Sequence, residues 1–277
     1  MSLTERVAPD HWSLSSLNCP EPGDTTVLTT LIRGLRVLEL IAGGAGKATA
    51  KSVQADLGLK QATVYHLLRT LRSSGHIVRL KGGFYDVGPG SLTLGRSLAV
   101  RTTAPTEIMM LLARLHNKTH ETCYLSGWHH GAIVLQHYLS TPHSMAISRL
   151  DVGYTYNMHA RASCRAVLAF LSENDIERMF EGVALQRLTP KTVADYDALL
   201  VTLAAIRSKG YAIEQEEFQE GACCIAAPFF DRHLYPRGSF TVSVPVERFN
   251  SDGISVVHAV RESAIMATNL FTRGILQ

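Results

Sequence analysis

The sequence contains few cysteines and no long apolar segment. Its five cysteines include no CxxC pair, which fits free thiols in a reducing compartment better than a disulfide framework. No stretch of 18 residues is continuously apolar, and residues 1–24 lack the basic start, apolar core and cleavage site of a secretory signal. We therefore expect neither export nor membrane insertion, and we expect a cytoplasmic location.

Acidic residues are scarce in one part of the chain. Residues 25–103 contain eleven Lys and Arg against three Asp and Glu, a net charge of +8. Residues 1–24 carry −3 and residues 104–277 carry −2. A strongly cationic segment joined to a near-neutral remainder is the charge distribution expected of a nucleic-acid-binding module attached to a second domain.

The cationic segment shows three helical patterns in succession. The first ends at Gly43, and the second covers 50–57, with Thr49 as its N-cap and Gly58 as its end. The third begins only two residues later, and four of its apolar residues share one face at i, i+3, i+4 and i+7. These are Val64, Leu67, Leu68 and Leu71. Helix, tight turn and helix in this order are typical of a helix-turn-helix.

A basic hairpin is predicted directly after these helices. HIVRL and FYDV are β-prone, and Lys81-Gly82-Gly83 between them supplies glycines for the positive φ of a tight turn. Three helices and a hairpin indicate a winged helix-turn-helix. The predicted division is a flexible tail at 1–24, this domain at 25–90, a linker helix at 91–103 and a second domain at 104–277.

The second domain mixes strand and helix patterns. Helices are expected in SCRAVLAFL, in ALLVTLAAIRSKG and from about Ser251 to Phe271, where Val256, Val260, Ile265 and Leu270 would face inward. Strands are expected in CYLSGW, AIVLQHYL, MAISRL, YAIEQ, CCIAAPFF and SFTVSVPV. The pattern predicts an antiparallel sheet covered by helices, so the fold class is α+β with a sensor-type second domain.

The third helix carries polar and basic groups opposite its leucines. In an arbitrary helix such a face is simply solvated, but the second helix of a helix-turn-helix enters the major groove. Gln61 and His66 would then contact base edges, and Arg69 guanine or phosphate. The predicted DNA-binding residues are Lys60, Gln61, Ala62, Thr63, Tyr65, His66 and Arg69, with Arg79 and Lys81 on the wing.

Three other motifs favour structural interpretations. GGAGKAT at 43–49 lacks the spacing of a phosphate-binding loop and is expected to be an interhelical loop. His116 and His120 are four residues apart, but no cysteine or carboxylate set completes a zinc site, so no metal is expected. Cys223-Cys224 lies in an apolar run without an adjacent base, which argues against a catalytic thiolate.

The chain resembles the IclR family of bacterial transcription regulators over about residues 26–275. The resemblance rests on RGLRVLELIA, LGLKQATVYHLLRTLRSSGHI and FYDVGPGSLTLG, then on MHARASCRAVLAFL and IRSKGYAIEQEEFQEGACCIAAPFFD. It departs at Cys164-Arg165, where the family usually has Gly-Lys, and at His66, where it usually has Arg. The resemblance implies a winged helix-turn-helix joined by a linker helix to a GAF-like effector-binding domain, in a dimer or tetramer on a palindromic operator.

The resemblance also implies a binding site for a small effector, often a carboxylate. The matching positions are Ala162, Ser163, Glu214, Cys224, Thr241 and Ser243. Backbone N–H groups at the start of a helix and hydroxyl side chains suit an anion. Glu214 suits it only if the carboxyl is protonated, bridged by water or paired with a ligand hydroxyl or amide.

Together these observations predict an effector-responsive, DNA-binding repressor of a catabolic operon, without enzymatic activity or cofactor. The rival hypothesis is an enzyme at 104–277 that uses Cys224 or Glu214, with the basic segment as a DNA tether. A third is an architectural DNA binder that is indifferent to sequence, which would leave the second domain without a purpose.

Overall fold

The computed structural model describes residues 28–129, 131–140, 150 and 152–276. The chain divides into two compact units, Met1–Arg101 and Thr102–Gln277, and each is described by itself. The predicted tail at 1–24 lies outside the described residues, and so does the strand predicted in MAISRL except for its last residue. No described helix is long and apolar enough to cross a membrane.

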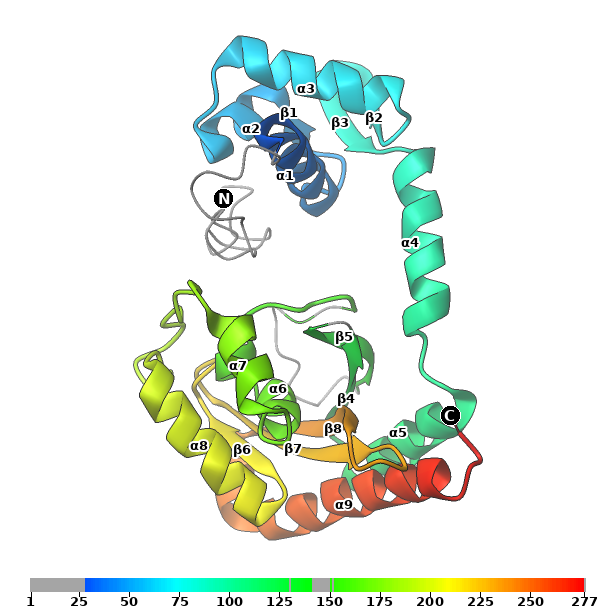
Figure 1. Ribbon diagram of the computed structural model, residues 1–277, viewed down its shortest axis with the longest axis vertical. Helices are drawn as coiled ribbons and strands as arrows, with labels where there is room; N and C mark the ends of the chain where they lie inside the picture. The colour runs from blue at the N-terminus through cyan, green and yellow to red at the C-terminus, as the bar shows by residue number, and fades with distance from the viewer. Residues whose placement is uncertain (1–27, 130, 141–149, 151, 277) are drawn as a thin grey trace. The chain divides into compact units, whose positions relative to one another are not determined.

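The first unit combines helices with a small sheet (Figure 1). Its elements are α1 (Thr29–Gly43), β1 (Ala48–Thr49), α2 (Ala50–Leu57), α3 (Gln61–Ser73), β2 (Ile77–Arg79), β3 (Phe84–Val87) and α4 (Pro89–Thr102). The three helices, the hairpin and the helix after it confirm the predicted winged helix-turn-helix, although α4 begins two residues before the expected linker helix.

Local signals fix the helix-turn-helix. The Thr49 hydroxyl accepts the Ser52 N–H at 3.1 Å, and the Ser52 hydroxyl accepts the Thr49 N–H at 2.9 Å. This reciprocal cap starts α2, and Gly58, at φ +61°, ends it. The apolar face of α3 packs into a core with α1, α2 and the sheet. Because this core holds α3 from beneath, its opposite face is fixed in space.

The small sheet has the order β1-β3-β2, with both pairs antiparallel. The predicted hairpin is confirmed, and Gly82 and Gly83 have the positive φ that its tight connection requires. The stretch at 43–49 is not only a loop, because Ala48 and Thr49 form β1 against β3. Two residues are too few for a periodic signal, so the sequence pattern could not show this strand.

The second unit is an antiparallel sheet with helices on both faces. The strand order is β5-β4-β8-β7-β6. Its helices are α5 (Thr106–Thr119), α6 (Ala162–Leu168), α7 (Glu173–Phe180), α8 (Tyr196–Lys209) and α9 (Val246–Thr272). Its strands are β4 (Thr122–His129), β5 (Ala132–Leu139), β6 (Ala212–Gln215), β7 (Ala222–Phe230) and β8 (Pro236–Pro245). The predicted α+β class is confirmed.

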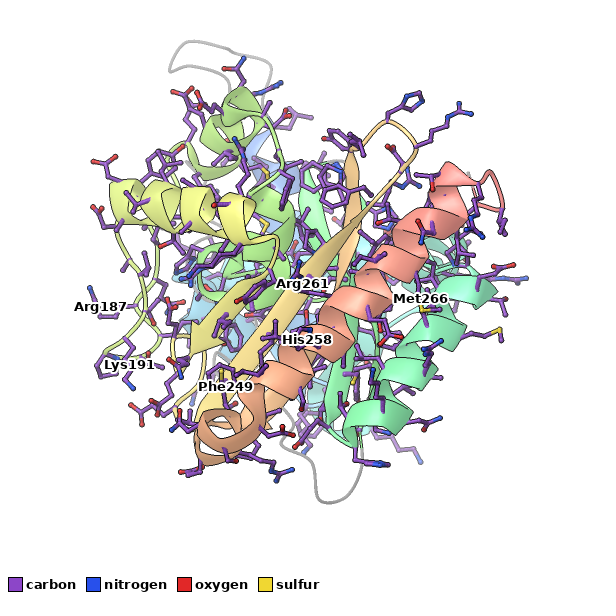
Figure 2. The ribbon with its side chains drawn as sticks, turned by 90° about the horizontal axis from the view of Figure 1, so that it is seen from below. Arg187, Lys191, Phe249, His258, Arg261 and Met266 are labelled. Carbon is purple, nitrogen blue, oxygen red and sulfur yellow. The ribbon has the colours of Figure 1, made fainter. Side chains whose placement is uncertain are left out.

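Alternation along the strands divides the second unit into two cores. On β8, Phe240, Val242 and Val244 face a core formed with α5 and α9. Figure 2 shows α9 lying across that face of the sheet with α5 beside it, and His258, Arg261 and Met266 along α9. The intervening residues of β8 are polar, and one of them, Ser239, donates a hydrogen bond to the Ser163 carbonyl of α6 at 2.8 Å. Along β8, the residues that face α6 are therefore polar, while the neighbouring strands contribute apolar residues to a core with α6 and α8.

The prediction for α9 is wrong in two respects. The helix begins at Val246, with a non-helical residue at Asp252, and Ile265 is 57% exposed instead of facing inward. The buried stripe of α9 consists of Gly253, Val256, Ala259, Val260, Ser263, Ala264, Ala267 and Phe271. Small residues let this stripe lie close against the sheet. Ile265 follows the buried Ala264 by one residue, which turns its side chain about 100° around the helix, away from the sheet. Burial thus follows close packing and not side-chain hydrophobicity alone.

Candidate functional site

The outward face of α3 is polar and exposed among the described residues of its own unit. Gln61, Tyr65, His66 and Arg69 are exposed, as are Lys60 and Ala62, while Thr63 is half-buried. Within the described residues, no side-chain hydrogen bond or ion pair holds the Gln61, His66 or Arg69 side chains. The buried face consists of Val64, Leu67 and Leu68, with Leu71 half-buried. A rigid ridge of hydrogen-bonding and cationic groups therefore stands on an apolar base.

The wing adds two exposed cations to the first unit. Arg79 ends β2, and Lys81 begins the short 3₁₀ turn that joins β2 to β3. Both side chains are exposed. A guanidinium and an ammonium on a hairpin next to a polar helix are the arrangement that contacts phosphates in winged DNA-binding domains.

A cavity lies in the second unit between α6 and the sheet face that carries Ser239 and Thr241. It is lined by five of the six residues expected around an effector: Ala162, Ser163, Glu214, Cys224 and Thr241. The sixth, Ser243, does not line the cavity; it is buried on β8 opposite Cys224 in the sheet register. The empty space between these side chains is about 320 Å³, a volume that includes open solvent at the mouth of the cavity.

The helix argument for this site needs correction. Ala162 and Ser163 do begin α6, as expected, but α6 is only seven residues long. A helix dipole is the sum of its aligned peptide units, so a helix of this length supplies little positive charge for an anion. The positive charge of the cavity has another source.

Arg161, which the sequence reasoning missed, lines the cavity and is only 3% exposed. Its Nη1 donates to the backbone carbonyls of Tyr154 at 3.5 Å and Tyr156 at 3.3 Å, and its guanidinium lies 5.1 Å from the centre of the Tyr154 ring. Its Nε and Nη2 are buried and have no hydrogen-bond partner among the described residues. The two arginines of HARASCRA were a signal in the sequence, but spacing alone does not show which of them faces a cavity.

Glu214 contributes the acidic group of the cavity. Its Oε1 accepts the backbone N–H of Phe218 at 2.9 Å and that of Glu217 at 2.5 Å. Burial in the protein raises the pKa of its carboxyl from 4.5 to about 7, in spite of these hydrogen bonds. Near neutral pH the carboxyl is therefore partly protonated, which removes much of the conflict between Glu214 and an anionic ligand.

The cysteines of the second unit are buried and poorly ionised. Burial raises the pKa of the Cys223 thiol to about 12 and that of Cys224 well above its ordinary value. A thiol that stays protonated at neutral pH is a weak nucleophile. In the part of the chain that the structure describes, no group of three or more His, Cys, Asp and Glu is placed to hold a metal ion.

Comparison with known proteins agrees with this arrangement of two units. The family model described as the IclR helix-turn-helix domain matches residues 30–80. The model described as the C-terminal part of the bacterial transcriptional regulator IclR matches residues 99–267, more than half of the chain. The chain belongs to the IclR family.

Two curated members of the IclR family show how far the similarity extends. The transcriptional repressor IclR of Escherichia coli K12 is 29% identical over 248 residues, 86% of this chain and 89% of that protein. The regulator BhcR of Paracoccus denitrificans is 31% identical over 245 residues, 86% of this chain and 87% of that protein. This IclR-family chain is therefore a DNA-binding transcription regulator and not an enzyme.

Solved structures of IclR-family proteins share the fold. The Thermotoga maritima IclR has a TM-score of 0.64 at 22% identity, covering 88% of this chain and 99% of that one. An IclR homologue from Microbacterium hydrocarbonoxydans, solved in complex with 4-hydroxybenzoate, has a TM-score of 0.67 at 22% identity, covering 88% and 99%. At this level of identity the likeness concerns the fold.

Proposed function

We propose that this protein is a repressor of a catabolic operon, released or engaged by a small organic acid, and that it works as a homo-oligomer in the cytoplasm. The observation that carries the proposal is the pairing of an exposed polar helix on a rigid core with a cavity in a separate compact unit, in which a buried arginine and a few polar side chains meet an apolar lining. Family membership adds operator DNA as the target, and the E. coli relative is itself named a repressor.

The DNA-binding surface in this proposal consists of α3 and the wing. Gln61 and His66 hydrogen-bond base edges, and Arg69 contacts guanine or phosphate. Arg79 and Lys81 bind phosphates and so fix the position of α3 on the duplex. Lys60, Ala62, Thr63 and Tyr65 complete the contact surface around the first turns of α3, and all of them are exposed except the half-buried Thr63.

The sensor in this proposal is the cavity beneath α6. Ala162, Ser163, Glu214, Cys224 and Thr241 line it, and Ser243 supports it from the neighbouring position on β8. A small acid is favoured because the cavity is small and contains a buried cation. The IclR homologue from Microbacterium hydrocarbonoxydans, which shares this fold, was solved in complex with an organic acid, 4-hydroxybenzoate, and this supports the choice.

Exposed apolar residues of the first unit support self-association. Leu31 and Leu35 on α1 are 61% and 51% exposed, and α4 exposes three further leucines at Leu92, Leu94 and Leu98. Water-exposed leucines grouped on helices are typical of protein interfaces. A second copy would pair two α3 helices for half-sites about 34 Å apart or a multiple of that distance. An effector that binds two dimer arrangements unequally would change this spacing.

Selection of binding sites tests the proposal. Full-length protein is used to select duplexes from a random-sequence pool, and an inverted repeat is expected. Arg69→Ala should weaken binding to the selected duplex by about 1 to 3 kcal/mol, whereas Arg178→Ala, an exposed arginine of the second unit, should not. Random DNA that competes as well as the selected duplex would contradict the proposal, and so would small acids that never alter its affinity.

A further inference from the structure

Two buried arginines four residues apart have different surroundings. Arg165 is 1% exposed and holds the Glu217 carboxylate in two hydrogen bonds, at 2.7 and 2.5 Å. Arg161 is 3% exposed, and only its Nη1 has hydrogen-bond partners, both of them neutral carbonyls. Its remaining N–H groups, on Nε and Nη2, have no partner among the described residues. Among the described residues, one guanidinium is thus neutralised by a carboxylate and the other is left without one, facing a cavity.

Burying a charge without a counter-ion costs free energy, so the Arg161 guanidinium, unpaired among the described residues, indicates that an anionic partner is missing. Removing a guanidinium from water without an anion costs several kcal/mol, and the described residues compensate Arg161 with two carbonyls and the face of Tyr154 alone. Nε and a terminal nitrogen on one edge of a guanidinium form the fork that receives both oxygens of a carboxylate. The missing partner is therefore an anion of that geometry.

A second unpartnered polar group lies in the same cavity. The Thr241 hydroxyl is buried and has no hydrogen-bond partner among the described residues. Thr241 belongs to β8 and Arg161 precedes α6, so the two groups approach the cavity from different layers of the unit. Buried hydroxyls are almost always hydrogen-bonded in native structures, which again indicates a polar ligand.

We propose that Arg161 binds the carboxylate of the effector and restricts the effector to small monocarboxylates. This inference rests on the proposed function, because it assigns the ligand class of the same cavity. The apolar residues Tyr124, Leu135, Leu150 and Phe218 line the rest of the cavity and receive an apolar body. Glu214 lines it as well, so a second ligand carboxylate would meet a like charge or compete for one proton. Dicarboxylates should therefore bind more weakly than monocarboxylates of the same shape.

Matched pairs of acids and amides test the inference on the full-length protein. Calorimetric titration compares benzoate with benzamide, 4-hydroxybenzoate with 4-hydroxybenzamide, lactate with lactamide and pyruvate with pyruvamide, and terephthalate serves as the dicarboxylate. At least one monocarboxylate should bind about tenfold or more tightly than its amide, the difference expected for charge-assisted hydrogen bonds. Terephthalate should bind more weakly than benzoate.

Variants at position 161 test whether Arg161 is the residue that binds the ligand carboxylate. Arg161→Met should remove the preference for acid over amide, and Arg161→Lys should keep it in weaker form, because an ammonium lacks the planar fork. Arg207→Met is the matched control: Arg207 also donates to backbone carbonyls, those of Ala169 and Leu171, but does not line the cavity. It should keep the full preference. If Arg161→Met does not fold, the inference is still tested by the acid and amide titrations of the wild-type protein and of Arg161→Lys.

Several outcomes would overturn the inference. The inference fails if acids and amides bind equally, or if no acid in the panel binds. It also fails if terephthalate binds more tightly than benzoate, or if a folded Arg161→Met protein keeps the preference for acid over amide. These titrations contain no DNA. If an acid binds through Arg161 but never alters operator affinity, the proposed function fails while the inference stands.

Discussion

Arg165 of α6 and Glu217, in the connection between β6 and β7, form a two-pronged ion pair at 2.7 and 2.5 Å. Arg165 Nε also donates to the His159 carbonyl, and Glu217 Oε2 accepts the Val193 N–H at 3.2 Å. The Thr192 hydroxyl donates to the Glu217 carbonyl at 2.6 Å. The Arg165–Glu217 pair thus joins three chain segments, those of His159, Val193 and Glu217. Arg165 stands where the family usually has lysine, and its planar guanidinium makes two parallel hydrogen bonds that a lysine ammonium could not make.

Loss of this pair should destabilise the second unit strongly. Arg165→Met leaves the half-buried Glu217 carboxylate without its cation, and removing one partner of a buried pair costs about 3 to 5 kcal/mol. The free energy of unfolding is measured in urea by the fluorescence of Trp128 in a Trp12→Phe background, so that only the second unit reports. Arg178→Met breaks an exposed pair with Asp175 and should cost less than about 1 kcal/mol. Equal effects of the two variants would contradict the interpretation.

The raised pKa of Glu214 predicts a pH dependence with a definite sign. Between pH 4.5 and about 7 the folded protein keeps a proton on Glu214 that the unfolded chain has released, so stability falls as the pH rises through this window. The difference is about 3 kcal/mol at most. Glu214→Gln has no proton to lose and its amide oxygen still accepts the Glu217 and Phe218 N–H groups. Its stability curve should therefore be flatter, and curves parallel to the wild type would be evidence against the shift.

The helix-turn-helix could be predicted because its signals are local. Thr49, Gly58 and the leucine spacing of α3 each act within a few residues, and each lies where it was expected. The cavity was reached through the family resemblance, not through local patterns. Arg161 was missed because its role depends on the backbone carbonyls of Tyr154 and Tyr156 and on the lack of an ion pair with any described acid, and the residues next to it in the sequence show neither. The position of Ile265 likewise depends on which face of α9 lies closest to the sheet.

The cap at Thr49 should make a measurable contribution to the first unit. Thr49→Ala removes the acceptor for the Ser52 N–H at the start of α2 and should cost about 1 kcal/mol. Because two units need not unfold together, native-state hydrogen exchange of the α2 and α3 amides is the measurement. Thr70→Ala is the control, since the Thr70 hydroxyl is exposed and only donates back to the His66 carbonyl. It should change protection by less than about 0.5 kcal/mol.

The wing should contribute to the salt dependence of binding and not to sequence choice. If the ammonium of Lys81 contacts a phosphate, Lys81→Ala releases about one fewer counterion and lowers the salt slope of log K by about 1. The affinity is measured on the selected duplex between about 50 and 200 mM salt, and the base preferences of the variant should match those of the wild type. Gln61→Ala should do the reverse, keeping the slope and relaxing preference at one position, because an amide in the groove meets base edges and not phosphates. Lys209→Ala, an exposed lysine at the end of α8, should change neither quantity. An unchanged slope in Lys81→Ala would place Lys81 off the DNA and leave Arg79 as the predicted phosphate contact of the wing.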